Sequence, residues 1–402
     1  MDDITSVVSS TIDQESSDLY RLSQSIWNQP ELGFKEQFAH AELTDFLEKT
    51  GFVVEKSFKL ETAFRATYKH TEASISTSGP NVAILCEYDA LPGIGHACGH
   101  NLIAEVGVAT ALAVKAAMIA NPEQFSGTLT VLGCPAEEGL CGKADLLRLG
   151  AFDGIDVAVM AHPSQTTLAT PNYVSMSPLS IKYFGKAAHA SSYPWEGLNA
   201  LDAAVACYNN ISNLRQQMKP NWRVHGVIKN GGAQPNIIPE ETELEYYLRT
   251  PTDDEMVTLK QKVEGCVQGA ALATGCTVEM KFSDKSYSNL LSNKTLVELF
   301  VKNAVPFGIE FETNEEKKRK FGGSTDMGNV SHVIPSIHPK FYIGTSVSNH
   351  SKEFTVAAGD MKAQKYSLDI AKALAMTALE VYHKPDLMNQ IKIDLNKDIS
   401  GQ

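Results

Sequence analysis

A thiol and two imidazoles lie close together in the segment 96–100, which reads His-Ala-Cys-Gly-His. The segment follows an apolar run that is typical of a buried strand, and Gly99 lets the backbone turn tightly between Cys98 and His100. A thiolate and a neutral imidazole are both good ligands for zinc. The alternative is a loop histidine beside a structural thiol, but the grouping of three such residues favours a metal site.

A pair of adjacent carboxylates, Glu137 and Glu138, follows the next apolar run in the sequence Cys-Pro-Ala-Glu-Glu-Gly. One carboxylate of such a pair can bind a metal while its neighbour takes a proton from metal-bound water. A Glu-Glu pair is also ordinary in a solvated loop or at a helix N-terminus, where the helix dipole favours negative charge. The nearby thiol and imidazoles favour the functional interpretation.

Two further histidines, His162 and His350, each follow shortly after a predicted strand. Five candidate ligands are more than one tetrahedral zinc needs. They are enough for two metal ions if one ligand bridges and water completes the coordination. The candidate ligands are Cys98, His100, Glu138, His162 and His350. The histidines assigned by default to the core or the surface are His40, His70, His225, His332, His338 and His383.

Three polar residues in the middle of the chain are candidates for contacts with a substrate. His189 lies among small residues in the run GKAAHA, which would let another molecule approach its ring closely. Asn236 lies in the loop GGAQPN, and Arg249 ends the strand that follows. An amide and a guanidinium group suit a carboxylate. The alternatives are a histidine that stabilises a tight turn and two ordinary surface residues.

The composition narrows the class of protein before any element is placed. The chain has 402 residues, which is long enough for two or three domains, and 43% of them are hydrophobic. Lys and Arg total 35 against 47 Asp and Glu, a formal charge of −12. This balance disfavours sequence-independent binding to nucleic acid and predicts a soluble globular protein.

The sequence also carries expectations about the compartment. The N-terminal run MDDITSVVSSTIDQE has neither the basic and apolar regions of a secretory signal nor the character of a mitochondrial transit peptide. No uninterrupted apolar run approaches the roughly 18 residues that a membrane-spanning helix needs. Seven scattered cysteines do not suggest a disulfide framework in a chain of this length. These features predict a reducing, cytoplasmic setting and no membrane partner.

The elements that must position the candidate ligands are predicted by apolar periodicity. Apolar strands at 82–87, 128–134 and 156–161 alternate with helices, including an alanine-rich helix at about 102–119. This alternation predicts an α/β domain with a mainly parallel sheet. Because ligands bind at the carboxyl ends of strands in such a sheet, the candidate ligands are expected to meet there.

The pattern changes from about residue 176 to a β-α-β-β-α-β order, which is typical of a ferredoxin-like α+β sandwich. We therefore expect an inserted domain at residues 176–287 and a discontinuous metal-binding domain at residues 1–175 and 288–402. The last twenty residues are polar with little periodicity and are predicted to form a loosely held tail. The expected elements of the insert are strands at 178–184, 223–229, 242–249 and 276–282 and helices at 197–217 and 253–273.

The order of these motifs resembles the amidohydrolase branch of the aminoacylase-like di-zinc metallopeptidases over nearly the whole chain. The similar runs are DALPGIGHACGHN, PAEEG, AHP, GKAAHA, GGAQPNIIP, GGSTDMGNVS and GTSVSNHSKEF. Within that branch, Asn101 and the run HACGHNLIAEVGVA are similar to a subgroup of dipeptidases that act on β-alanyl and other dipeptides ending in a basic residue. The resemblance implies a zinc-peptidase-like catalytic domain and an inserted lid and dimerisation domain.

The resemblance also implies a role for each candidate ligand. Cys98 would bridge two divalent metal ions, with zinc the expected metal and manganese, cobalt or nickel open alternatives. His100 and His162 would complete one site, and Glu138 and His350 would complete the other.

The remaining roles are implied in the same way. Glu137 would be the general acid/base, and Asp89 would orient a ligand histidine. His189 would hydrogen-bond the oxyanion of the tetrahedral intermediate, often from the other subunit of a dimer. Asn236 and Arg249 would hold the substrate carboxylate.

The sequence departs from many members of the branch at Glu87 and Asn101, where aspartate is common. Neither change touches a candidate ligand, and the general base is retained. The expected activity is hydrolysis of dipeptides that end in Lys, Arg or ornithine. The alternatives left open are an N-acyl amino acid amidohydrolase and a non-catalytic dipeptide-binding protein.

Overall fold

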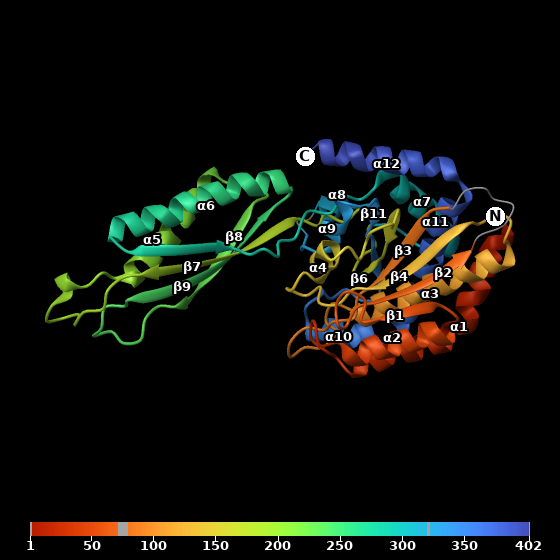
Figure 1. Cartoon of the computed structure of the whole chain (residues 1–402), viewed down its shortest axis with the longest axis horizontal. Coiled ribbons are helices and arrows are strands. Elements are labelled where there is room, and N and C mark those ends of the chain that lie inside the picture. The colour runs from red at the N-terminus through yellow and green to blue at the C-terminus, as the bar shows by residue number, and fades with distance from the viewer. Residues whose placement is uncertain (1, 71–78, 320–321, 402) are drawn as a thin grey trace. The chain divides into compact units, whose positions relative to one another are not determined.

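The computed structural model describes residues 2–70, 79–319 and 322–401, and the chain divides into two compact units (Figure 1). We call them the large unit and the small unit. The large unit comprises Met1–Asn172, Leu290–Gly322 and Asp326–Gly401. The small unit comprises Tyr173–Asn289 and Gly323–Thr325.

A six-stranded sheet forms the centre of the large unit, in the order β1-β2-β4-β3-β5-β11. The four strands from β4 to β11 are parallel, which confirms the predicted α/β fold with a mainly parallel sheet. The antiparallel strands β1 and β2 were not predicted, because both mix exposed polar residues with few apolar ones. The strands are β1 (Val53–Lys56), β2 (Phe64–His70), β3 (Asn81–Cys86), β4 (Gly127–Gly133), β5 (Val157–Val159) and β11 (Ser336–Ile337).

Helices cover both faces of this sheet. Successive side chains of a strand point to opposite faces, and in the central strands the side chains on both faces are apolar. Val82 and Ile84 of β3 join the core beneath α1, α2, α3, α7 and α11, whereas Ala83 and Leu85 join the core beneath α4 and α9 (Figure 1). The helices are α1 (Asp2–Asn28), α2 (Gln37–Lys49), α3 (His100–Ala120), α4 (Gly142–Arg148), α7 (Lys294–Ala304), α9 (Met327–Ser331) and α11 (Met361–His383).

Helix α3 is long and apolar enough to cross a membrane by length and composition, although Glu105 and Lys115 interrupt its apolar residues. Of its most apolar 18-residue window, 83% is buried inside the protein. It packs against α1 and α11, so its apolar character is that of a core helix.

One acidic side chain, Glu105 of α3, is completely buried in this core. Burial raises the pKa of Glu105 to about 8. Above the ordinary pKa of a glutamate, the unfolded chain releases the proton of Glu105 whereas the folded protein keeps it. The free energy of unfolding therefore falls as the pH rises towards 8. We expect the free energy of unfolding of Glu105→Gln, measured relative to that of wild type, to be about 3 kcal/mol higher at pH 8 than at pH 5. Urea unfolding at the two pH values measures this difference.

The matched control for that experiment is Glu298→Gln, which changes a side chain that is 68% exposed on α7. Its difference from wild type should be small and the same at both pH values. An equal gain for Glu105→Gln at pH 5 and pH 8 would contradict the assignment.

The small unit has a four-stranded antiparallel sheet in the order β10-β7-β9-β8, with α5 and α6 packed on one face (Figure 1). Along the chain its elements follow the order β-α-β-β-α-β. Strand β8 forms an edge of the sheet, and its residues are mostly exposed. The elements are β7 (Ser175–Phe184), α5 (Ala200–Asn213), β8 (Arg223–Asn230), β9 (Glu241–Thr250), α6 (Asp253–Thr274) and β10 (Thr277–Phe282).

The C-terminal segment is a helix, α12 (Pro385–Ser400), and the prediction of a loosely held tail is wrong. Ile391 is fully buried, and its carbonyl accepts a hydrogen bond of 2.8 Å from the side chain of Asn293. Asp394 accepts hydrogen bonds of 3.0 and 2.6 Å from the amide and hydroxyl of Thr295 at the start of α7. A few apolar contacts and these hydrogen bonds hold α12 in place. Its sequence is polar and weakly periodic, so the sequence alone did not predict a helix.

Short elements complete the large unit. The predicted strand at 156–161 is observed as the shorter strand β5, and the residues that follow it form a further strand that pairs with β12 in a separate two-stranded sheet. These remaining elements are β6 (His162–Ser164), β12 (Lys340–Tyr342), α8 (Glu315–Arg319) and α10 (Lys352–Gly359).

Candidate metal centre

Cys98 and His100 lie at the N-terminal end of α3, directly after the loop that follows β3. Gly99 between them adopts a left-handed backbone with φ of 77°. A Cβ atom at Gly99 would lie 2.6 Å from the side chain of Pro163. Glycine is therefore required both by the turn and by the close approach of Pro163, the residue after His162.

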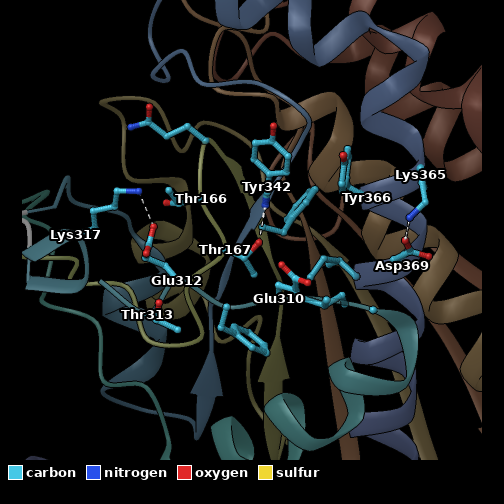
Figure 2. A pocket seen from close by; sticks show the side chains of 16 residues that line it. Thr166, Thr167, Glu310, Glu312, Thr313, Lys317, Tyr342, Lys365, Tyr366 and Asp369 are labelled. Atoms are coloured by element: carbon cyan, nitrogen blue, oxygen red, sulfur yellow. Dashed lines mark hydrogen bonds and ion pairs between the residues drawn. The ribbon is translucent and has the colours of Figure 1, made fainter. Parts of the chain in front are cut away.

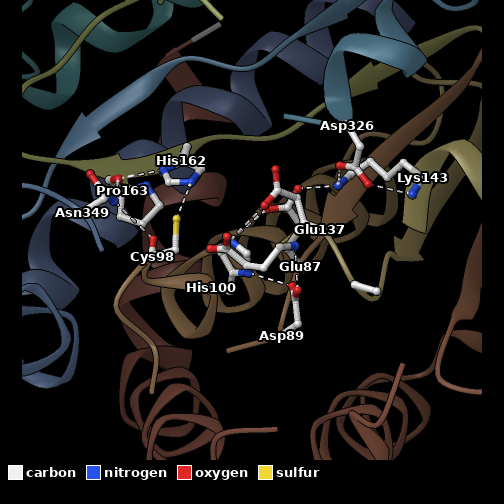
Figure 3. Close-up of polar contacts among 12 residues, drawn as sticks. Glu87, Asp89, Cys98, His100, Glu137, Lys143, His162, Pro163, Asp326 and Asn349 are labelled. Carbon is white, nitrogen blue, oxygen red and sulfur yellow. Dashed lines mark hydrogen bonds and ion pairs between the residues drawn. The ribbon is translucent and has the colours of Figure 1, made fainter. Parts of the chain in front are cut away.

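The thiol and the imidazole of His162 meet at this turn (Figure 3). The Sγ atom of Cys98 lies 3.3 Å from Nε2 of His162. The Nδ1 atom of His162 lies 2.8 Å from the carbonyl oxygen of Pro163, to which it can donate its proton. This hydrogen bond leaves Nε2 of His162 with a lone pair that faces Cys98.

Asp89 links two other candidate ligands. Its Oδ1 atom accepts a hydrogen bond of 2.8 Å from Nδ1 of His100, and its Oδ2 atom accepts one of 2.9 Å from the backbone amide of Glu138. Burial lowers the pKa of His100, but the adjacent Asp89 outweighs burial and raises that pKa well above its usual value. Nε2 of His100 is buried and has no hydrogen-bond partner among the described residues, as is typical of a metal ligand.

The carboxylate pair follows β4 in a turn that another acid holds in place. Ala136 has a left-handed φ of 60°, and its amide donates a hydrogen bond of 2.8 Å to Oε1 of Glu36. The buried Glu36 carboxylate also accepts a 2.8 Å hydrogen bond from Thr62. This anchor sets the position of Glu137 and Glu138.

Glu138 and His350 form the other side of the cluster. The Oε1 atom of Glu138 lies 3.5 Å from Nε2 of His350 and 3.8 Å from Nε2 of His100. His350 has a left-handed φ of 66°, and its amide donates a 2.8 Å hydrogen bond to the carbonyl of Ala97. Burial raises the pKa of Glu138, but the close contact with His350 and the charge of His100 hold that pKa below its usual range.

The donor atoms fit a pair of transition-metal ions. Within the described part of the chain, Oε1 of Glu138 and Nε2 of His100 are buried without hydrogen-bond partners, and both atoms could coordinate metal ions. A thiolate with three imidazoles and a carboxylate suits zinc better than it suits calcium or magnesium. The ligand atoms lie within 4.8 Å of one another in three groups: Cys98, His100 and His162; Cys98, Glu138 and His350; and His100, Glu137 and Glu138.

Glu137 lies beside the ligands with little exposure to solvent. Burial raises the pKa of its carboxyl well above the usual value, and the negative charges of Glu87 and Glu138 raise it further. Its Oε2 atom lies 4.0 Å from Nε2 of His100. A carboxyl group with a raised pKa next to bound metal can accept a proton and return it.

A buried lysine lies behind these carboxylates and was not singled out in the sequence (Figure 3). The ammonium group of Lys143 contacts Oε1 of Glu87 and Oδ1 of Asp326, and all three side chains are fully buried. Oε2 of Glu87 lies 3.5 Å from Nε2 of His100. Lys143 therefore compensates part of the negative charge around the site. Glu87 contacts Lys143 through one carboxylate oxygen and approaches the candidate ligand His100 through the other.

Two other residues have clear contacts that the sequence did not indicate. His338, assigned by default to the core or surface, stacks on His162 with ring centroids 5.6 Å apart. Asn101 donates hydrogen bonds of 3.1 Å to Ser23 and 3.0 Å to the carbonyl of Ala358. An aspartate at position 101 could not donate these bonds, so the amide fits this chain.

The residues predicted to contact a substrate all lie in the small unit: His189, Asn236 and Arg249. Nδ1 of His189 accepts backbone hydrogen bonds of 3.3 Å from Ser191 and Ser192. The amide of Ala190 bonds the carbonyl of Asn236 at 3.0 Å, so the segments of His189 and Asn236 are neighbours. Arg249 lies on β9.

The side-chain partners of Arg249 also belong to the small unit. Its Nη1 atom donates a 2.9 Å hydrogen bond to the hydroxyl of Ser324, and its Nε atom lies 3.3 Å from Nε2 of His225. Burial lowers the pKa of the Arg249 guanidinium from its usual value.

Residues 83–366 match the family described as Peptidase family M20/M25/M40. The chain is 51% identical over 391 residues to Xaa-Arg dipeptidase of Homo sapiens, with 95% of this chain and 90% of that protein covered. It is 51% identical over 387 residues to Xaa-Arg dipeptidase of Mus musculus, with 95% and 89% covered. These similarities confirm the resemblance to the amidohydrolase branch and to its dipeptidase subgroup.

A solved structure shares the fold. A dinuclear metal-binding peptidase of the M20 family from Bacillus subtilis superimposes with a TM-score of 0.68 at 20% identity. The alignment covers 92% of this chain and 99% of the other.

Proposed function

Because the chain belongs to peptidase family M20/M25/M40, we propose that it is a metal-dependent dipeptidase that hydrolyses the amide bond of dipeptides. The proposed substrates end in a basic residue, Lys, Arg or ornithine, and include β-alanyl dipeptides. The 51% identity to the human and mouse dipeptidases supports this substrate class. The observation that carries the proposal is the convergence of five candidate ligands beside the buried carboxyl of Glu137.

Two divalent metal ions, with zinc preferred by the thiolate, are the proposed cofactors. Cys98 would bridge them, because its Sγ atom belongs to two of the ligand groups. His100 and His162 would complete one site, and Glu138 and His350 would complete the other. Bound ions of this kind lower the pKa of a coordinated water and polarise the substrate carbonyl.

The chain's own acids would then move the proton. A carboxylate oxygen of Glu137 takes the proton of the attacking water and returns it to the nitrogen of the leaving amine. Asp89 holds the proton of His100 on Nδ1, which keeps Nε2 available as a ligand atom. Lys143 lowers the cost of placing several carboxylates in one buried site.

The small unit would contribute contacts to the substrate and act as a lid. Nδ1 of His189 accepts two hydrogen bonds, so a neutral ring carries its proton on Nε2 and can donate it to an oxyanion. Asn236 and Arg249 offer an amide and a guanidinium group for the substrate carboxylate.

The same unit is the proposed dimer surface of a homodimer. Strand β8 lies at an edge of its sheet with Val227 56% exposed, and Tyr208 on α5 is 43% exposed. An exposed apolar edge strand can pair with a second copy. Light scattering should give twice the chain mass, and Val227→Lys should shift the population towards monomer.

A reducing compartment such as the cytoplasm suits this proposal. The described residues include all seven cysteines and contain no disulfide, and a bridging thiolate is vulnerable to oxidation.

Elemental analysis of protein purified without added metal, paired with a turnover screen, tests the function. We expect about two zinc ions per chain and preference for dipeptides ending in Lys, Arg or ornithine, because thiolate and imidazole ligands favour zinc. Removal of the metal with a chelator should abolish turnover, and added zinc should restore it. Preference for N-acyl amino acids would instead indicate an amidohydrolase, and absence of both metal and turnover would indicate a binding protein.

A further inference from the structure

A cavity of about 520 Å³ lies in the large unit, outside the candidate ligands (Figure 2). Its walls come from strand β12, helix α11, the segment after β6 and residues 308–317. None of its lining residues belongs to a ligand group of the metal centre. The cavity therefore requires an explanation separate from metal binding.

The charges in the cavity leave one carboxylate without a partner. Lys317 pairs with Glu312 at 2.8 Å, and Lys365 pairs with Asp369 at 2.9 Å. Among the described residues, Glu310 has neither an ion pair nor a hydrogen bond to its side chain, and Figure 2 shows its carboxylate within the ring of lining residues. The lining side chains thus carry a net charge of −1, which favours a cationic ligand.

The rest of the wall suits an aliphatic stem and a charged head. The rings of Tyr342 and Tyr366 meet edge to face with centroids 5.1 Å apart, and Phe341 and Ile370 add apolar surface. The ammonium group of Lys365 already lies 5.6 Å from the centroid of Tyr366. Aromatic rings attract ammonium and guanidinium groups, and methylene stems pack on apolar surface.

We propose that this cavity binds the side chain of a basic amino acid, with its ammonium or guanidinium group at Glu310 and its stem against Tyr342. The cavity begins on the strands that carry the metal centre. His162 on β6 pairs with Lys340 on β12. Tyr342 lies two residues beyond Lys340, which is roughly 7 Å along the strand. A lysine or arginine side chain spans a comparable length.

Two sources of this cation are chemically equivalent. It can be the basic side chain of the dipeptide at the metal centre, which rests on the function proposed above. It can also be a free basic amino acid, the product class of that reaction, bound at a site of its own. The charge and the stem length are the same in both cases, so Glu310 would contact either ligand.

Calorimetry with the metal-loaded enzyme tests binding without relying on turnover. Arginine and lysine should bind the wild type, whereas norleucine, which lacks the charge, should not. Glu310→Gln should weaken arginine binding about tenfold, because it removes the unpaired carboxylate. Glu316→Gln is the matched control, since this exposed acid of α8 lies outside the cavity and should leave binding unchanged.

Steady-state kinetics separates the two sources. If the substrate supplies the cation, Glu310→Gln should lower kcat/KM about tenfold for a dipeptide ending in lysine but not for one ending in norleucine. If a free amino acid supplies it, both kcat/KM values stay at wild type while arginine binding falls. The proposal is overturned if arginine binding and the lysine-to-norleucine ratio both match wild type. Absence of turnover would contradict only the proposed function, because the calorimetric comparison still decides on the cavity.

Discussion

Replacement of Glu137 by glutamine should lower kcat by a factor of about 10²–10⁴ while the metal content stays near wild type. Glutamine has nearly the same shape as glutamate but cannot accept and return the proton. Among the described residues, Glu137 belongs to one ligand group, whereas its neighbour Glu138 belongs to two and lies 3.8 Å from His100 and 3.5 Å from His350. The loss should therefore appear in the proton-transfer step and spare the binding of metal.

The measurement combines elemental analysis with kcat and KM for a dipeptide ending in lysine. Glu138→Gln is the matched control at the adjacent position, and it should lose metal as well as activity, because Glu138 Oε1 is the buried atom that faces both histidines. Wild-type turnover in Glu137→Gln would remove Glu137 from the mechanism. A loss of metal equal to that of Glu138→Gln would make Glu137 a ligand instead.

The sequence predicted the parts of the site that depend on local grouping. Cys98 and His100 are two residues apart, and Glu138 directly follows Glu137, so short motifs indicated them. The strands that carry these motifs are continuous apolar runs, and the parallel sheet brings their carboxyl ends together. The candidate ligands could therefore be named before any distance between them was known.

The sequence could not predict contacts between distant segments that carry no motif. Lys143 and Asp326 are 183 residues apart, and each alone is an ordinary charged residue in a turn or helix start. His338 follows a strand of only two residues, so periodicity gave no reason to place it against His162. Strand β1 and helix α12 were missed because their positions depend on tertiary contacts that outweigh local propensity.

The buried lysine gives the second large effect that we expect. Lys143→Met should destabilise the protein by about 3–5 kcal/mol, because it leaves Glu87 and Asp326 fully buried without their cation. Burial already raises the pKa of both acids even with Lys143 present. Without the lysine, both pKa values should rise further. The folded protein would then hold protons that the unfolded chain releases, so the loss of stability should be larger at pH 8 than at pH 5.5.

Urea unfolding at the two pH values measures this effect, and two further variants separate charge from packing. The triple variant Lys143→Met, Glu87→Gln and Asp326→Asn removes all three charges and should regain much of the lost stability, since buried ions can be replaced by neutral groups at little cost. Lys56→Met breaks an exposed pair with Asp45 and should cost less than about 1 kcal/mol. If Lys143→Met behaved like Lys56→Met, or if its effect were independent of pH, charge compensation would not be the role of Lys143. If the triple variant remained as unstable as the single one, the aliphatic stem of the lysine and its packing would account for the loss.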